Sequence, residues 1–288
     1  MPLLRLIAIL SCLLLLAACN STRLAYNNLN WLIGWKVSDY IPLNSEQKTW
    51  LSEEVKAHQA WHCSTEIPRY RPMLANLQST LETDKLDAAQ LMDQIPQLEP
   101  AVDRLLVEVA PTMAELFKQL DDVQLSALKA NLAEQHEEMV EKFAGPDAAT
   151  QAKERSERLE KRLNRWLGRL NEAQRARIES WSAGLEDQNR IWLDNRQQWQ
   201  QQLLTTLETQ REAEDFNDQI SQLLVERERY WTDDFIQRSE INTRAGAQML
   251  ADVMNTATDT QRSRMAQQFT KLDRDLQQMQ CESPSSQT

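Results

Sequence analysis

The sequence predicts an all-α protein, and three observations lead to that prediction. Only five of its 288 residues are glycine, whereas glycine usually makes up roughly 7% of a protein. Leu, Gln, Glu, Arg and Ala dominate and β-branched residues are sparse, a mixture that favours helices over strands. Leu, Trp, Met and Ile recur at spacings of three and four residues, as on the buried face of a helix. We therefore expect a bundle of about eight helices without a sheet.

The chain begins with a segment that resembles a bacterial lipoprotein signal peptide. Arg5 supplies the charge of a short leading region, and the apolar run 6–16 follows. This run is too short to cross a bilayer, which needs roughly 20 apolar residues. Two alanines then precede Cys19. We expect residues 1–18 to be removed and Cys19 to carry lipid as a short N-terminal tether; an ordinary signal peptide with an incidental cysteine is the alternative.

The residues after the leader suggest where the protein resides. Asn20 stands where inner-membrane lipoproteins of enterobacteria carry aspartate, so we expect an outer-membrane anchor with the protein facing the periplasm. Cys63 and Cys281 remain once Cys12 leaves with the leader and Cys19 takes lipid. Because the periplasm is oxidising, we predict a disulfide between these two, with a pair of free thiols as the alternative.

Five helix starts share a capping signal, in which Asn, Asp or Thr is followed three residues later by glutamine. The first side chain can accept from the backbone of the glutamine, and the glutamine can reach back to the cap. A leucine precedes the cap in the first four. The pairs are Asn44–Gln47, Asp87–Gln90, Asp121–Gln124, Asn171–Gln174 and Thr258–Gln261.

Glycine and proline mark the helix ends. Gly145-Pro146 ends one helix before Asp147 opens the next, which Gly168 ends. We expect Pro68 and Pro72 to bound a turn after the first long helix. Three further prolines break or kink the stretch 88–119: Pro96, Pro100 and Pro111.

The segments 43–82 and 170–209 look like distant copies, since both begin with Leu-Asn and run into leucine-rich ends. The bundle, 19–281, can therefore consist of two similar halves, 19–145 and 147–281. Unequal spacing of the helix starts argues against a solenoid of fixed period. The tail, 282–288, has the composition of a disordered segment.

No sequence motif points to catalysis. Nucleotide-binding and nucleophile-elbow motifs need glycines at fixed places, and the chain contains neither G-x-G-x-x-G, nor a P-loop, nor G-x-S-x-G. The formal charge of −11 disfavours a nucleic-acid partner. We therefore expect a protein that is not an enzyme and needs no cofactor.

His58 and His62 are the only weak candidates for a metal site. They stand four residues apart and so share a helix face, with Glu54, Cys63 and Glu66 nearby. The sequence between them reads His-Gln-Ala-Trp-His, which lacks the glutamate of H-E-x-x-H. We favour two ordinary histidines on the helix surface.

Tryptophans offer a possible binding surface. Trp181, Trp192 and Trp199 fall with leucines on one seam of what we expect to be a single helix. We favour a core stripe, which a bundle interior needs. The alternative is a wide groove for a partner helix, an unfolded client or a glycan strand. Closer to the anchor, Trp31 and Trp35 can lie at the membrane interface or in the first bundle helix, and we favour packing.

Several short stretches, spread over most of the mature chain, form a recognisable set. They are Arg23-Leu24-Ala25-Tyr26-Asn27-Asn28-Leu29, Trp31-Leu32, Asp39-Tyr40, Leu43 with Gln47, Trp61-His62, Ile67-Pro68-Arg69-Tyr70 and Trp166-Leu167-Gly168-Arg169-Leu170. They resemble a family of bacterial lipoproteins classed as a domain of unknown function. The resemblance implies an all-helical, lipid-anchored envelope protein and brings no activity. The Leu-[Asn/Asp]-x-x-Gln starts are more weakly similar to the Leu-Thr-x-x-Gln signature of small periplasmic helical chaperones.

We expect a role in binding another protein in the periplasm, as a scaffold, a chaperone-like holder or an envelope-stress accessory. A peptidoglycan- or glycan-binding envelope protein is the alternative. A metal-binding protein or enzyme built on His58 and His62 is a further one. The sequence leaves the partner and the oligomeric state open.

Overall fold

The computed structural model describes residues 26–279. The predicted leader 1–18, Cys19, Cys281 and the tail 282–288 lie outside the described residues. Within them the regular elements are all helical and no strand occurs, which confirms the predicted all-α class.

The described helices follow one another in this order: α3 (Leu29–Ser38), α4 (Ser45–Trp61), the π-helical turn η1 (His62–Glu66), α5 (Ile67–Leu81), α6 (Ala88–Met92), α7 (Ile95–Lys118), α8 (Asp122–Phe143), α9 (Ala148–Leu167), α10 (Glu172–Ala183), α11 (Gln188–Thr209), α12 (Phe216–Val225), the 3₁₀ turn η2 (Arg227–Tyr230), α13 (Asp233–Asn255) and α14 (Asp259–Gln277).

The described part of the chain has about ten helices rather than the eight expected, if α4, η1 and α5 count as one continuous helix and the short α6 is left out. The predicted number of helices was too low because some breaks between helices have only weak signals in the sequence. The breaks at 210–215 and 226–232 contain neither glycine nor proline. A third break, 184–187, divides the expected single tryptophan helix into α10 and α11. It begins at Gly184 and includes Glu186 at φ 38°.

Pro68 and Pro72 do not bound a turn, so that prediction was wrong. The chain remains helical through both, because the π-helical turn η1 lies immediately before Pro68. Here the backbone N–H of Ile67 donates to the His62 carbonyl, five residues back. Proline lacks a donor and crowds the carbonyl four residues earlier, and a wider turn accommodates both effects. Similarly, α7 runs on through its two internal prolines.

The predicted helix starts are confirmed. All five capping boxes form, with each cap side chain accepting from the glutamine backbone and each glutamine side chain accepting from the cap backbone. Asp147 caps α9 through the backbone N–H of Thr150, and Gly168 ends that helix at φ 77°.

Four of the capping glutamines also join helix starts in pairs. Gln47 and Gln124 exchange two side-chain hydrogen bonds of 3.1 and 2.6 Å. Gln174 and Gln261 exchange two of 3.0 Å. All four side chains are buried. Each pair therefore fixes two helix N-termini against each other, α4 with α8 and α10 with α14.

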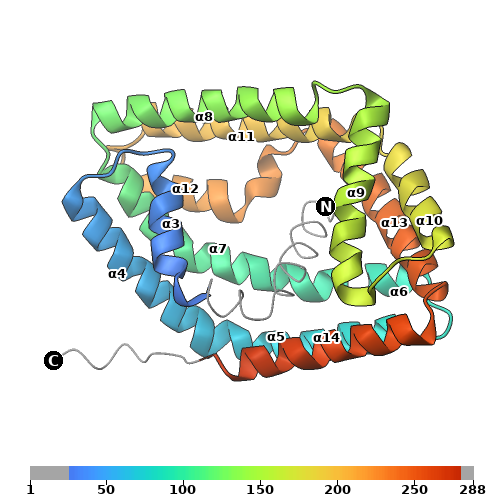
Figure 1. Cartoon of the computed structure of the whole chain (residues 1–288). Coiled ribbons are helices and arrows are strands. Elements are labelled where there is room, and N and C mark those ends of the chain that lie inside the picture. Colours follow the sequence, from blue (N-terminus) through green and yellow to red (C-terminus); the bar gives the residue numbers. More distant parts are fainter. Residues whose placement is uncertain (1–25, 280–288) are drawn as a thin grey trace.

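The helices are arranged as a frame (Figure 1). α8 and α11 lie side by side along one edge, and α5 and α14 lie side by side along the opposite edge. α9, α10 and α13 lie at one end of the frame, and α3 and α4 lie at the other. None of the helices between residues 26 and 279 is both long and apolar enough to cross a bilayer.

Two hydrophobic cores hold this frame together, and each takes helices from both sides of residue 146. One core lies among α5, α6, α9, α10, α13 and α14, and the other among α4, α7, α8, α11 and α12. Contacts between helices of the first core and of the second core can be matched in pairs. The contact α3–α4 corresponds to α9–α10, α4–α7 corresponds to α10–α13, α5–α14 corresponds to α11–α8, and α6–α13 corresponds to α12–α7. The similar halves 19–145 and 147–281 remain a prediction, and a duplication with exchanged helices would produce this pattern.

Candidate functional site

Four arginines lie along one side of α9 at spacings of three and four residues, which places them on one helix flank. This arginine flank consists of Arg155, Arg158, Arg162 and Arg165. The neighbouring face of α9, with Leu159 and Leu163, is buried in the first core. This flank was not predicted, although arginines spaced by three and four residues are visible in the sequence.

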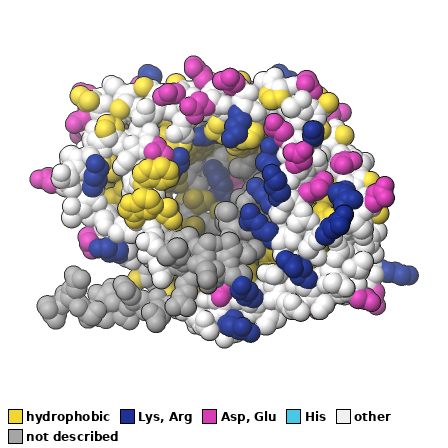
Figure 2. Space-filling model, in the orientation of Figure 1, with side chains coloured by type: hydrophobic (Ala, Val, Ile, Leu, Met, Phe, Trp, Pro, Cys, Tyr) yellow, Lys and Arg dark blue, Asp and Glu magenta, His cyan; other side chains and the backbone are white. Residues whose placement is uncertain are grey.

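The arginine flank borders a hollow at the centre of the molecule. Figure 2 shows this hollow, with Lys and Arg side chains gathered along the side where α9 lies. Hydrophobic side chains gather on the other side, over α3. The two sides of the hollow thus differ in chemistry.

Arg155 is the most enclosed member of the flank. Its Nη1 donates to the Ser182 carbonyl at 2.7 Å, and its Nη2 has no hydrogen-bond partner among the described residues. Burial, together with the nearby Arg158 guanidinium, lowers the pKa of Arg155. A half-buried cation with an unsatisfied donor is unfavourable on its own, so an anion at this position would be stabilised.

In the outer part of the flank, Arg158 and Arg165 keep most of their charge uncompensated within the described residues. Arg158 lies 3.4 Å from Glu154, but both are exposed, and such pairs contribute little. Its guanidinium also lies 5.8 Å from the centre of the Phe143 ring. Arg165 is exposed and forms no ion pair within residues 26–279. The flank therefore presents a positive surface on a chain of formal charge −11.

The three tryptophans of the predicted seam lie on two helices. Trp181 on α10 packs against the first core, whereas Trp199 on α11 packs against the second. The Trp199 indole N–H donates to the Leu223 carbonyl at 2.8 Å. Trp192 meets Phe143 edge to face, with ring centroids 6.3 Å apart. Trp181 and Trp199 thus belong to different cores, and a binding role for the three stays a prediction.

His58 and His62 reach different partners although they share a helix face. The ring nitrogens of His58 lie 3.1 Å from Glu108 Oε1 and 2.8 Å from Thr112 Oγ1, both on α7. No cluster of three His, Cys, Asp or Glu side chains that could hold a metal occurs in the described part of the chain.

The His62 ring lies between two tyrosines, at 3.2 Å from the Tyr26 hydroxyl and 3.0 Å from the Tyr70 hydroxyl. Because the Tyr26 hydroxyl donates to the Gln59 carbonyl, we assign His62 Nδ1 as a donor to Tyr26 and Nε2 as an acceptor from Tyr70. Burial lowers the pKa of His62, which favours this neutral ring.

Glu66 is a fully buried carboxylate between two arginines. Arg104 donates to it through Nε at 2.8 Å and Nη2 at 2.7 Å, and Arg69 donates through Nη1 at 3.0 Å. The Arg104 hydrogen bonds hold the pKa of Glu66 below its usual range. Sequence analysis treated Glu66 only as a spare metal ligand, because Arg104 comes from a different helix.

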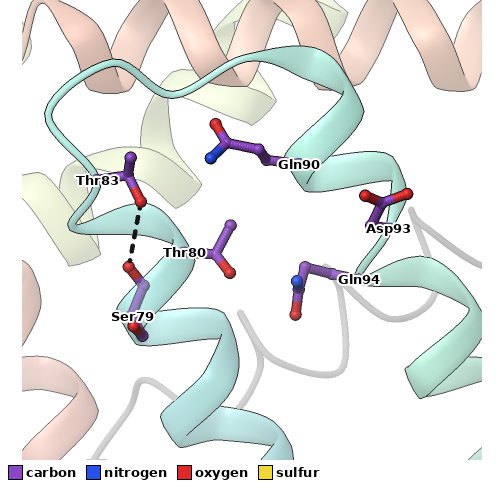
Figure 3. A pocket seen from close by; sticks show the side chains of 6 residues that line it. All are labelled: Ser79, Thr80, Thr83, Gln90, Asp93 and Gln94. Carbon is purple, nitrogen blue, oxygen red and sulfur yellow. Dashed lines mark hydrogen bonds between the residues drawn. The ribbon is translucent and has the colours of Figure 1, made fainter.

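Two further features complete the described surface and core. Cys63 is buried and disulfide-bonded; its predicted partner Cys281 lies outside the described residues, so that pairing stays a prediction. A pocket of about 230 Å³ opens at the corner of α5 and α6 (Figure 3). Its lining is polar and includes no cation, and we assign this pocket no ligand. The lining residues are Ser79, Thr80, Thr83, Gln90, Asp93 and Gln94.

The fold and the flank define an all-helical protein with a basic surface beside a central hollow. The chain belongs to a family described as a family of unknown function, DUF6279, whose model matches residues 39–236. The predicted membership of an all-helical family of unknown function is thereby confirmed. No curated protein and no solved structure matches the chain. Its lipoprotein nature and its likeness to periplasmic chaperones stay predictions.

Proposed function

We propose that this chain is a lipid-anchored protein of the bacterial envelope that binds another protein and catalyses no reaction. The apolar run 6–16, the two alanines and Cys19 support a lipid anchor, and Asn20 supports its place in the outer membrane on the periplasmic side. The protein would serve as a scaffold, a chaperone-like holder or an envelope-stress accessory.

The arginine flank of α9 beside the hollow is the observation that carries this proposal. Arginine forms paired, charge-assisted hydrogen bonds with carboxylates, and a concentrated positive surface attracts an acidic partner. Arg165 is exposed and has no ion pair within the described residues, so it can donate to an outside carboxylate. We therefore assign the partner as a protein that presents acidic side chains to α9.

Site-specific crosslinking in cells tests this assignment. A photoreactive amino acid replaces Arg165 on the flank, and a matched one replaces Lys153, which is exposed on the opposite side of the same helix. We expect a discrete protein adduct from position 165 and none from position 153. Equal capture from the two positions, or recovery of glycan strands instead of protein, would contradict the proposal.

A charge series tests the arginines themselves. Arg158→Gln with Arg165→Gln removes two positive charges from the flank, and Lys153→Gln with Lys271→Gln removes two elsewhere. With the photoreactive residue placed at Glu154, next to the flank, we expect the first pair to lower capture by at least about tenfold, because two charge-assisted contacts are lost. The second pair should leave capture unchanged. Because all four side chains are exposed, circular dichroism should show the same fold in both variants.

A further inference from the structure

We infer that the outer face of α3 is a membrane-docking surface whose occupant is a phospholipid bilayer. Trp31 and Trp35 are the side chains that enter the interfacial layer. For its position next to a membrane this inference rests on the proposed anchor at Cys19. It adds a second, non-covalent contact, which holds the folded body against the bilayer.

The first argument is that α3 is apolar on two sides. Ile33 and Val37, four residues apart, pack against the second core. Asn30 Nδ2 donates to Ser52 Oγ on α4 at 2.8 Å, which fixes the rotation of α3 about its axis. Trp31 and Trp35 therefore project outward, where a surface helix normally carries polar residues.

The second argument is the exposure of this pair. Trp31 is 67% exposed and Trp35 is 58% exposed, and their rings stack with centroids 6.2 Å apart at an angle of 6°. The other large apolar side chains exposed within the described residues are all aliphatic. A Cβ atom at Gly34, next to Trp35, would meet no other atom within 4 Å, so this part of α3 faces open space. Hydrophobic side chains stand out over α3 in Figure 2.

The chemistry of this patch fits the polar–apolar boundary of a bilayer. Tryptophan is enriched there because it combines a large apolar ring with an N–H donor. Lys36 is adjacent to Trp35 and exposed, and its ammonium donates to Asp39 at 3.0 Å. An ammonium has three donors, so it can also reach lipid phosphates while its stem stays with the apolar layer. Isolated apolar side chains on a surface need no explanation, whereas a stacked aromatic pair on one helix does.

The third argument is the length of chain between the anchor and α3. Six residues lie between Cys19 and Tyr26, so the seven steps along the chain limit the distance between these two residues to about 25 Å. Tyr26 is itself fastened to α4, because its hydroxyl donates to the Gln59 carbonyl at 3.0 Å and Gln59 Nε2 donates to the Tyr26 carbonyl at 2.6 Å. A lipid at Cys19 therefore keeps the bilayer close to α3.

Tryptophan quenching by brominated lipid tests the inference. The chain from Asn20 onward carries an N-terminal histidine tag and is bound to phosphatidylethanolamine–phosphatidylglycerol vesicles that contain nickel-chelating lipid. The tag replaces the natural anchor, so the result does not depend on lipidation of Cys19. The chain has nine tryptophans. We expect vesicles with brominated acyl chains to quench the part of the tryptophan fluorescence that comes from Trp31 and Trp35. Trp31→Ser with Trp35→Ser should abolish this quenching.

A matched variant controls for loss of exposed apolar surface. Val123→Ser with Ile241→Ser removes side chains that are 74% and 52% exposed on α8 and α13. It should keep the wild-type quenching, and both double variants should unfold at the wild-type urea concentration. Equal emission of the wild type on brominated and ordinary vesicles would overturn the inference, as would quenching that survives in the tryptophan double variant. A failure of crosslinking at position 165 would leave this result unaffected.

Discussion

At the scale of single residues, Glu66 links segments that are far apart in the chain. It lies on η1, and its principal partner Arg104 lies on α7. A buried carboxylate is tolerated only when cations and hydrogen bonds compensate it. The Arg104 guanidinium on Glu66 therefore joins α7 to the continuous helix of α4, η1 and α5, whereas Arg69 comes from that same continuous helix.

Replacing this carboxylate should weaken the fold strongly. We expect Glu66→Gln to lower the free energy of unfolding by about 3–5 kcal/mol, because Arg104 keeps its charge and loses its counter-ion. Urea denaturation measures the difference. Glu82→Gln, on an exposed side chain near the end of α5, is the matched control and should stay within about 0.5 kcal/mol of the wild type. A loss below about 1 kcal/mol for Glu66→Gln would contradict this role.

The loss of stability caused by Glu66→Gln should depend on pH. The folded-state pKa of Glu66 lies below its ordinary value of 4.5, so its stabilisation is present above about pH 4.5 and is lost as pH falls through the folded pKa. At pH values between the folded-state pKa of Glu66 and 4.5, this carboxylate binds a proton in the unfolded chain but not in the folded chain. We expect the gap in stability between wild type and Glu66→Gln to narrow as urea titrations move from pH 6 to about pH 3.

At the scale of helices, the glutamine pairs do more than cap. Gln174 caps α10, bonds to Gln261 and donates to the Val253 carbonyl at 3.1 Å. Gln90 forms the same capping box on α6, but its bonds among the described residues stay within that box. Comparing these two glutamines therefore distinguishes the contribution of helix capping from the contribution of hydrogen bonds to other helices.

We expect Gln174→Ala to cost about 2–4 kcal/mol, since it removes a cap contact together with the buried hydrogen bonds to Gln261 and to the Val253 carbonyl. Gln90→Ala should cost only about 1 kcal/mol or less. Thermal unfolding followed by circular dichroism compares the two. Equal losses would mean that the buried pair adds nothing beyond capping.

The helix starts could be predicted because a cap and its glutamine lie only three residues apart. Helix continuity at Pro68 could not, because the local rule for proline takes no account of a wider turn that precedes it. The arginine spacing on α9 was visible in the sequence. That this flank borders a hollow depends on the placement of all the other helices, which no local pattern contains. Likewise, nothing near Glu66 in the sequence points to Arg104.

At the scale of the whole molecule, the two cores bind the chain into one body. α5 and α6 pack in the core that is otherwise formed by helices after residue 146, and α11 and α12 pack in the core formed by helices before it. This exchange holds the sides of the hollow, including α3 and α9, in fixed positions. The docking face on α3 and the basic flank on α9 therefore keep fixed positions relative to each other.

Both proposals place this body at a membrane through Cys19, and that is the central claim. The most direct test is the mass of the N-terminal peptide of protein taken from the envelope fraction of cells fed a labelled fatty acid. We predict a peptide that begins at Cys19 and carries acyl groups, and no labelling in a Cys19→Ser variant. A retained leader, or an unmodified N-terminus at another residue, would contradict the claim.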